Sequence, residues 1–149
     1  MKKFSLCVLL PLTLLAAGCD TGPESPRGFS LPVGDAAKGE VVFQEFNCTA
    51  CHTLKGKEGT SDSDAEVPVV LGGKVTRVKT YAELVTSIIN PSHRLAKGYP
   101  EEVIQENGQS KMTNFNAIMT VEQLANLVTF LQPHYELEKY EPTYYPSFY

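Results

Sequence analysis

Residues 48–52 of this 149-residue chain read Cys48-Thr49-Ala50-Cys51-His52, and the rest of the sequence is best interpreted from this motif outwards. The chain has four cysteines, of which Cys7 and Cys19 lie near the amino terminus. The other two are separated by two small residues and followed directly by a histidine. This spacing places two thiols and an imidazole on one tight turn, where they can act on the same group.

Two thiols spaced in this way before a histidine form the attachment pattern of c-type haem. Each thiol can add to one vinyl group of the same porphyrin, and the next residue then presents its imidazole to the iron. We therefore expect one haem c, bound covalently through Cys48 and Cys51, with His52 as the proximal iron ligand.

Three other interpretations fit the motif less well. A structural zinc site needs four ligands, and only His93 and His134 could complete it. A thioredoxin-like redox pair would follow a strand, whereas a helical pattern precedes this motif. A Cys48–Cys51 disulfide would close a strained, very short loop and leave His52 unexplained.

The first 18 residues have the pattern of a secretory signal peptide. Lys2 and Lys3 precede an apolar stretch over residues 4–17, which Pro11 interrupts. A short basic region before 7 to 15 apolar residues is typical of such signals, and the stretch is too short for a comfortable membrane span. We expect this signal to direct export of the protein and residues 1–18 to be removed from the mature chain.

The residues that follow suggest a lipid anchor. Ala16-Ala17-Gly18-Cys19 resembles the bacterial lipobox, in which cleavage before the cysteine leaves its thiol carrying lipid. Residues 19–33 would then be the lipidated Cys19 and a flexible tether rich in Gly, Pro and Ser. The expected location is the periplasmic face of a bacterial membrane, and Asp20 favours the inner one. The alternative is an ordinary secretory signal with a chance cysteine.

Three segments predict helices. Asp35 can cap a helix that runs to about Phe46, and Thr80 and Thr120 each open a capping box. Pro91 and Pro133 mark the ends of the second and third helices. The apolar positions expected to face the core are Ala37, Val41 and either Val42 or Phe43, then Tyr81, Leu84, Val85, Ile88 and Ile89, and finally Leu124, Leu127, Val128 and Leu131. Strand signals are weak, so the fold class is small, mostly α and rich in loops.

Over residues 34–135 the chain resembles the class I cytochromes c. The features that carry this resemblance are Gly39 and Phe43 four residues apart, the Cys-x-x-Cys-His motif, a methionine-containing loop, and a last amphipathic helix over residues 127–131. The resemblance implies three main helices and loops around one covalently bound haem. It also implies that Gly39 lets the first helix cross the last at close range.

The resemblance assigns a role to Pro68 as well. Pro68, with Leu71 and Gly72, is similar to the segment whose prolyl carbonyl accepts the N–H of the proximal histidine. Pro68 would then orient His52 and raise its basicity. The polar residues 55–66 before it are expected to form a surface insertion.

The sixth iron ligand must be chosen between two methionines of the exported chain. Met119 precedes the Thr120 cap, where an apolar residue can pack against Leu124. Met112 lies in a polar loop, where a thioether makes better sense as an iron ligand. The loop of the family usually reads Met-Pro-x-Phe, whereas residues 112–115 read Met-Thr-Asn-Phe. Met119, His93 and an open position remain the alternatives.

Charge limits the partners. The formal net charge is -4, which argues against nucleic acid as a binding partner. The sequence has no second long apolar run, so it does not have the pattern of a polytopic membrane protein. An acidic surface favours redox protein partners with basic docking surfaces. Residues 136–149 form a tail rich in Tyr and Pro, which either packs on the domain or docks on a partner.

These features predict an electron carrier and not an enzyme. With His52 and Met112 both bound, the iron has no free position for oxygen or peroxide. The protein would be a membrane-anchored monohaem cytochrome, either free or a subunit of a respiratory or sulfur-oxidising complex. The alternative is a peroxidase-like haem enzyme or gas sensor, in which the sixth position is open or displaceable.

Overall fold

The computed structural model describes residues 29–56 and 68–139 of the chain. The chain divides into Met1–Ser30 and Leu31–Tyr149, and the helices and strands described below all belong to the second unit. The four α-helices of the described part are α1 (Ala36–Glu45), α2 (Tyr81–Ile89), α3 (Glu101–Ile104) and α4 (Val121–Leu131). Three 3₁₀ turns accompany them, namely η1 (Cys48–Ala50), η2 (Pro91–His93) and η3 (Gln132–His134).

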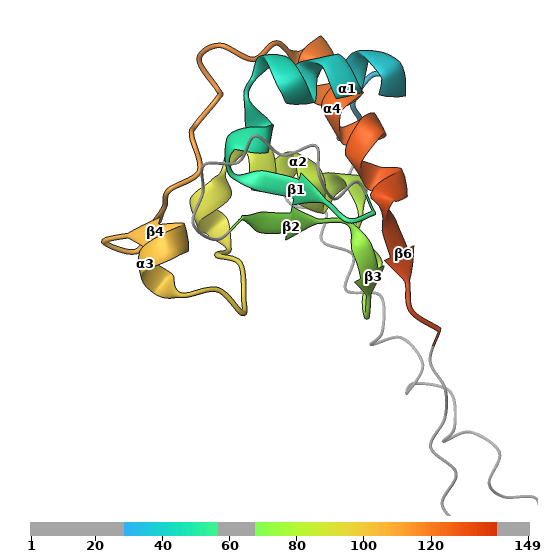
Figure 1. Ribbon diagram of the computed structural model, residues 1–149. Coiled ribbons are helices and arrows are strands. Elements are labelled where there is room, and N and C mark those ends of the chain that lie inside the picture. Colours follow the sequence, from blue (N-terminus) through green and yellow to red (C-terminus); the bar gives the residue numbers. More distant parts are fainter. Residues whose placement is uncertain (1–28, 57–67, 140–149) are drawn as a thin grey trace, which may run out of the picture. The chain divides into compact units, whose positions relative to one another are not determined.

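Six short strands pair two by two in the described part (Figure 1). Two of the pairs are parallel: β1 (His52–Leu54) with β2 (Val69–Leu71), and β3 (Gly73–Val75) with β6 (Tyr135–Leu137). The third is an antiparallel hairpin of β4 (Gln105–Glu106) and β5 (Gln109–Ser110).

All three predicted helices form where their caps were placed. The Asp35 carboxylate accepts hydrogen bonds from the N–H groups of Ala37 and Lys38, at 2.8 and 3.1 Å. Thr80 and Thr120 both complete capping boxes, with Glu83 and Gln123 respectively. The expectation of three helices missed the single turn of α3, which follows Pro100.

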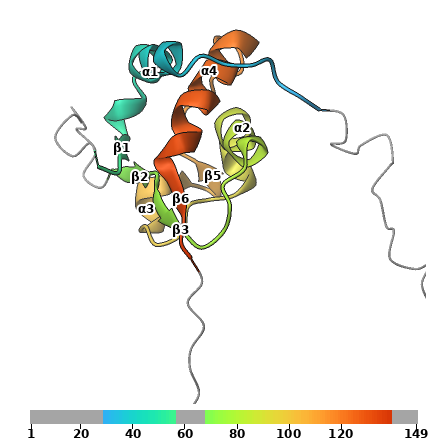
Figure 2. The same ribbon diagram turned by 90° about the vertical axis from the view of Figure 1, so that its right-hand side faces the viewer.

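Helix α4 lies between α1 and α2 (Figure 2). A Cβ atom on Gly39 would overlap the carbonyl oxygen of Asn126 and stand 2.6 Å from Cβ of Phe130, so the two backbones approach closely here. The Asp35 N–H donates to Oδ1 of the buried Asn126 at 2.7 Å, and the rings of Phe43 and Phe130 lie 5.8 Å apart. Glycine is therefore required at position 39 by packing.

The core is built on this crossing. Its buried members are Val42, Phe43, Leu54, Leu84, Val85, Ile88, Leu124, Leu127, Val128, Phe130 and Leu131. The predicted apolar face of α1 was partly wrong, because Ala37 is exposed and Val41 is 50% exposed, while Val42 is buried. The face is set by Gly39, and Val42 and Phe43 follow it at the i+3 and i+4 positions. The predicted face of α2 was also partly wrong, because Tyr81 and Ile89, at the two ends of the helix, are exposed while Leu84, Val85 and Ile88 are buried.

The boundary predicted between a domain at 34–135 and a tail at 136–149 cuts through a strand. Glu136 and Leu137 continue β6 beside β3, and the Glu138 N–H donates to the Val75 carbonyl at 2.9 Å. These residues belong to the fold because a parallel partner, remote in sequence, satisfies their backbone.

Several predictions lie outside the described residues. They are the signal peptide at 1–18, the lipidated Cys19, most of the tether, most of the insertion at 55–66, and the tail beyond residue 139. Among the described helices, none has the length and apolar character needed to cross a membrane.

Candidate functional site

The end of α1 delivers the two cysteines. Phe46 caps the helix, and Asn47 follows in the left-handed region with φ 53°. Asparagine is one of the few residues that adopt this conformation readily. The chain then turns into η1, where the Cys51 N–H donates to the Cys48 carbonyl at 3.3 Å. The two cysteines thus lie on one tight turn, with Cys48 half-buried and Cys51 exposed.

Cys48 and Cys51 are both free thiols and form no disulfide with each other. Burial raises the pKa of the Cys48 thiol to about 11, a backbone hydrogen bond opposes the shift, and the neighbouring Cys51 adds to it. A raised pKa is the opposite of what a thioredoxin-like nucleophile needs. Across residues 29–56 and 68–139, no cluster of three or more His, Cys, Asp and Glu side chains is arranged to hold a metal ion.

His52 begins β1 and points one ring nitrogen at the backbone of β2. Its Nδ1 lies 3.1 Å from the carbonyl oxygen of Val69. A carbonyl can only accept, so Nδ1 carries the proton and Nε2 keeps its lone pair for a metal. Burial lowers the pKa of the imidazole, and the Val69 hydrogen bond acts in the opposite direction. The His52 imidazole is therefore neutral and held in one orientation, with the Nε2 lone pair suited to binding iron.

The role predicted for Pro68 was wrong by one residue. The register of the parallel pair puts Val69 opposite His52, and the Val69 N–H donates to the Cys51 carbonyl at 2.8 Å. The acceptor for the His52 ring is therefore the Val69 carbonyl. On the outer edge of β2, the Val70 N–H donates to the Tyr99 hydroxyl at 3.0 Å, which steadies the strand.

The loop that carries Met112 runs from β5 to α4 along the side of the molecule where β1 begins (Figure 1). The ring of Phe115, in this loop, meets the ring of Phe46 edge to face at 5.5 Å. Because Phe46 lies two residues before Cys48, this contact brings the loop next to the motif. Met112 is half-buried in the loop, and Met119 is packed against the core that contains Leu124, as expected for a residue with a packing role.

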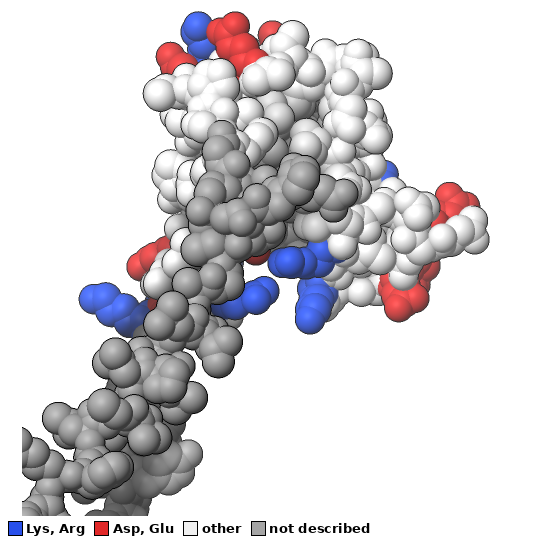
Figure 3. Space-filling model, turned by 180° about the vertical axis from the view of Figure 1, so that it is seen from behind, with Lys and Arg blue, Asp and Glu red and all other residues white. Residues whose placement is uncertain are grey.

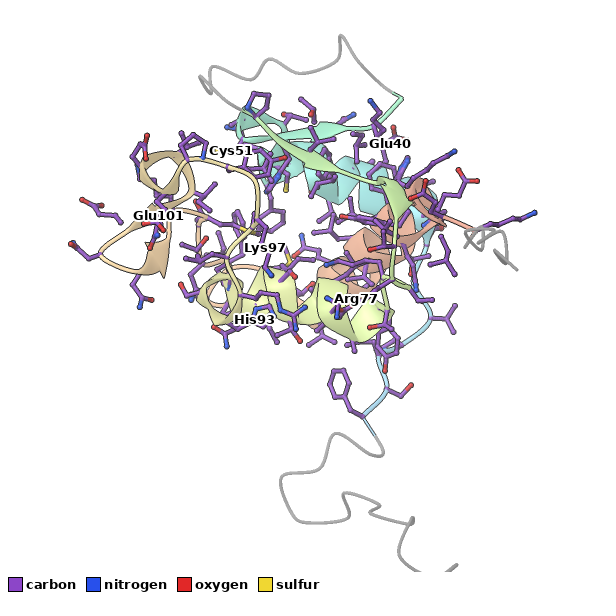
Figure 4. All side chains as sticks on the ribbon, turned by 90° about the horizontal axis from the view of Figure 1, so that it is seen from below. Glu40, Cys51, Arg77, His93, Lys97 and Glu101 are labelled. Carbon is purple, nitrogen blue, oxygen red and sulfur yellow. The ribbon has the colours of Figure 1, made fainter. Side chains whose placement is uncertain are left out.

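The remaining histidines have local partners. The exposed His93 donates from Nδ1 to the Asn90 carbonyl at 2.8 Å. In the view from below, His93 lies beside α2, well separated from Cys51 (Figure 4). The ring of His134 packs edge to face on Phe130, with 5.1 Å between centroids. These contacts give both residues structural roles.

Charges are unevenly distributed on the surface. Seen from behind, carboxylates gather over α3, and several Lys and Arg side chains lie on the lower part of the molecule (Figure 3). The α1–α4 end carries both signs, and Nζ of Lys38 lies 3.7 Å from a carboxylate oxygen of Glu122 there. The acidic residues of α3 and β4 are Glu101, Glu102 and Glu106. The acidic character expected from the composition is therefore not spread evenly.

Sequence reasoning missed Val69, Tyr99 and Phe46 as supporting residues of this site. Two of them act through the register of strands or through a contact remote in sequence, which no local pattern reveals. Only Phe46, at the end of a predicted helix and just before Cys48, had a signal that could have been noticed.

Comparison with protein families gives a match. A family model described as Cytochrome c matches residues 36–134. No curated protein and no solved structure matches the chain. The matched range begins with α1 and ends with η3, so it contains the motif, the Met112 loop and the crossing of α1 and α4.

Proposed function

This chain belongs to the cytochrome c family, and from that premise we propose that it is a class I, monohaem carrier of single electrons. The family indicates electron transfer by a haem protein. The observation that carries the finer proposal is the donor set at 48–52. There, two free thiols on one turn precede an imidazole whose second nitrogen is fixed by Val69.

The residues present fit a covalently held haem c. Bound haem would supply a couple of ferric and ferrous iron that exchanges one electron. Cys48 and Cys51 would hold it by thioether links, and His52 would donate Nε2. The Val69 carbonyl keeps the ring oriented and raises its basicity.

Met112 is proposed as the sixth ligand. Its loop lies against Phe46, and its thioether is the soft ligand that favours the ferrous state. A site closed on both sides by protein leaves no position for oxygen or peroxide. The protein would therefore transfer electrons and carry out no reaction on a substrate.

We further propose that the domain works close to a membrane. The signal-like residues 1–18 and the lipobox-like cysteine at 19 support export and lipidation of Cys19, with the domain tethered at the periplasmic face. The excess of acidic residues supports a redox partner with a basic docking surface. Mass spectrometry of the mature protein tests the anchor: acyl chains on Cys19 are expected, and an unmodified Cys19 would refute it.

A carbon monoxide titration of the reduced holoprotein tests the carrier function. The wild-type protein should bind carbon monoxide slowly or not at all, whereas Met112→Ala should bind it rapidly. Met119→Ala is the matched control, and it should behave like the wild type because Met119 packs on the core. Rapid binding by the wild type would instead favour a gas sensor or a peroxidase-like enzyme.

A further inference from the structure

The Met112 loop is fastened at both ends to the turn that ends α2. Before Met112, the Ser110 N–H donates to Oγ of Ser92 at 3.0 Å. After it, Nδ2 of Asn116 donates to the carbonyl oxygen of Ile89 at 2.8 Å. These two hydrogen bonds, here called the clasp, join residues that are 18 and 27 positions apart in sequence.

The anchoring side of the clasp is rigid. Ile89 is the last residue of α2, whose buried side chains Leu84, Val85 and Ile88 belong to the core. Its carbonyl is one of the four that a helix cannot satisfy internally, and Pro91 has no N–H to offer. The Asn116 amide therefore satisfies a helix carbonyl and ties the loop to the core at the same time.

Inside the loop, short-range hydrogen bonds continue from the clasp towards Met112. The Met112 N–H donates to Oγ of Ser110 at 3.1 Å, so the residue that contacts Ser92 also holds the backbone of Met112. On the other side, the Asn116 N–H donates to Oδ1 of Asn114 at 3.0 Å. Proline at position 113 would have stiffened the backbone, but this chain has Thr113. These two hydrogen bonds restrain the loop backbone on either side of Thr113.

We propose that Ser92 and Asn116 are positioning residues that keep Met112 in place and so keep the sixth coordination position closed to external ligands. This inference rests on the proposed function, in which Met112 is the sixth ligand. Apparent affinity for an external ligand is scaled by the fraction of molecules in which the loop is open. Removing either hydrogen bond of the clasp should therefore raise the fraction of molecules with an open loop, and the apparent affinity for the external ligand should tighten in the same proportion.

The test is a titration of the ferric holoprotein with imidazole, followed by the shift of the Soret band, which every haem-containing variant shows, and in methionine-ligated protein also by loss of the far-red charge-transfer band. Ser92→Ala and Asn116→Ala should each tighten the apparent affinity by roughly two- to tenfold, the worth of one ordinary hydrogen bond. The double variant should exceed both. Thr113→Ala, an exposed side chain in the same loop, is the matched control and should leave the affinity unchanged.

Met112→Ala separates the two ways of failing. Unchanged affinity in both clasp variants, with much tighter binding in Met112→Ala, would overturn the clasp and leave the proposed function standing. Unchanged affinity in Met112→Ala would overturn both, because Met112 would not be the ligand. If Asn116→Ala does not accumulate as folded protein, Ser92→Ala alone tests the clasp, because it removes only the hydroxyl that accepts the Ser110 N–H.

Discussion

The ring of Phe115 meets the ring of Phe46 edge to face, with an interplanar angle of 88° and 5.5 Å between centroids. The contact joins the loop that carries Met112 to the residue that caps α1 just before the Cys-x-x-Cys-His motif. It therefore couples the two sides of the proposed iron site through one packed pair. Aromatic pairs of this geometry contribute beyond the area they bury.

Phe115→Leu tests this coupling. The variant keeps an apolar side chain but loses the edge-to-face pair, so the free energy of unfolding should fall by about 0.5–1.5 kcal/mol. The methionine-ligation band of the ferric protein should also disappear at a lower temperature than in the wild type. Ile118→Ala, a residue of the same loop that is 66% exposed, is the control. Equal behaviour of the two variants would show that the contact is incidental.

Gly39→Ala tests the crossing of α1 and α4. Alanine is intrinsically better than glycine in a helix by about 1 kcal/mol, but its Cβ would meet the Asn126 carbonyl, which is fixed in α4. Overpacking of this kind typically costs about 1–3 kcal/mol, so the net change in denaturant unfolding should be destabilising. Val41→Ala, at a half-exposed site on the same helix, should have little effect. A stabilised Gly39→Ala protein would contradict the close approach.

The capping box of α2 should respond to acid. The Glu83 pKa lies below its ordinary value of 4.5, chiefly because its carboxylate accepts the Thr80 N–H, while Lys79 and Arg94 lower it further. A pKa lowered in the folded state means that the stabilisation is complete above pH 4.5 and is lost as the pH falls through the folded pKa. Because the Glu83 side chain is 33% exposed and screened by solvent, the effect is small.

Glu83→Gln provides the measurement. The amide of Gln can still accept the Thr80 N–H but carries no charge. The difference in melting temperature between wild type and variant should therefore shrink as the pH falls from 6 to 3, a range of about one to two units either side of the ordinary pKa. The capping box of α4 is the internal control, because its Gln123 is uncharged and should not respond to this change of pH. A difference that stays constant with pH would show that the carboxylate charge contributes nothing.

The local part of the fold could be predicted from the sequence, whereas the pairings between remote segments could not. Asp35, Thr80 and Thr120 cap their helices because a cap depends on the next three residues alone. The acceptor for His52 was misplaced at Pro68, because the register of β1 and β2 is set by pairing across the intervening segment. The same reason hid the pairing of β3 with β6, which carries the strand past residue 135.

The candidate site divides in the same way. Cys48, Cys51 and His52 were identified because their chemistry lies in five consecutive residues. Met112 was selected by its polar surroundings, and the structure adds the contacts of its loop. The Asn116 bond to the end of α2 could not be predicted, because Asn116 looks like any polar loop residue until the α2 terminus is placed beside it.

Acid–acetone extraction of the purified protein, matured in a host that exports and assembles c-type cytochromes, tests the central claim most directly. If haem is linked through Cys48 and Cys51, the pigment should stay with the protein, and a Cys48→Ala/Cys51→Ala variant should lose it to the solvent or never acquire it. Wild-type protein that is colourless, or that releases its pigment to the solvent, would contradict the covalent haem site and the electron-carrier function built on it.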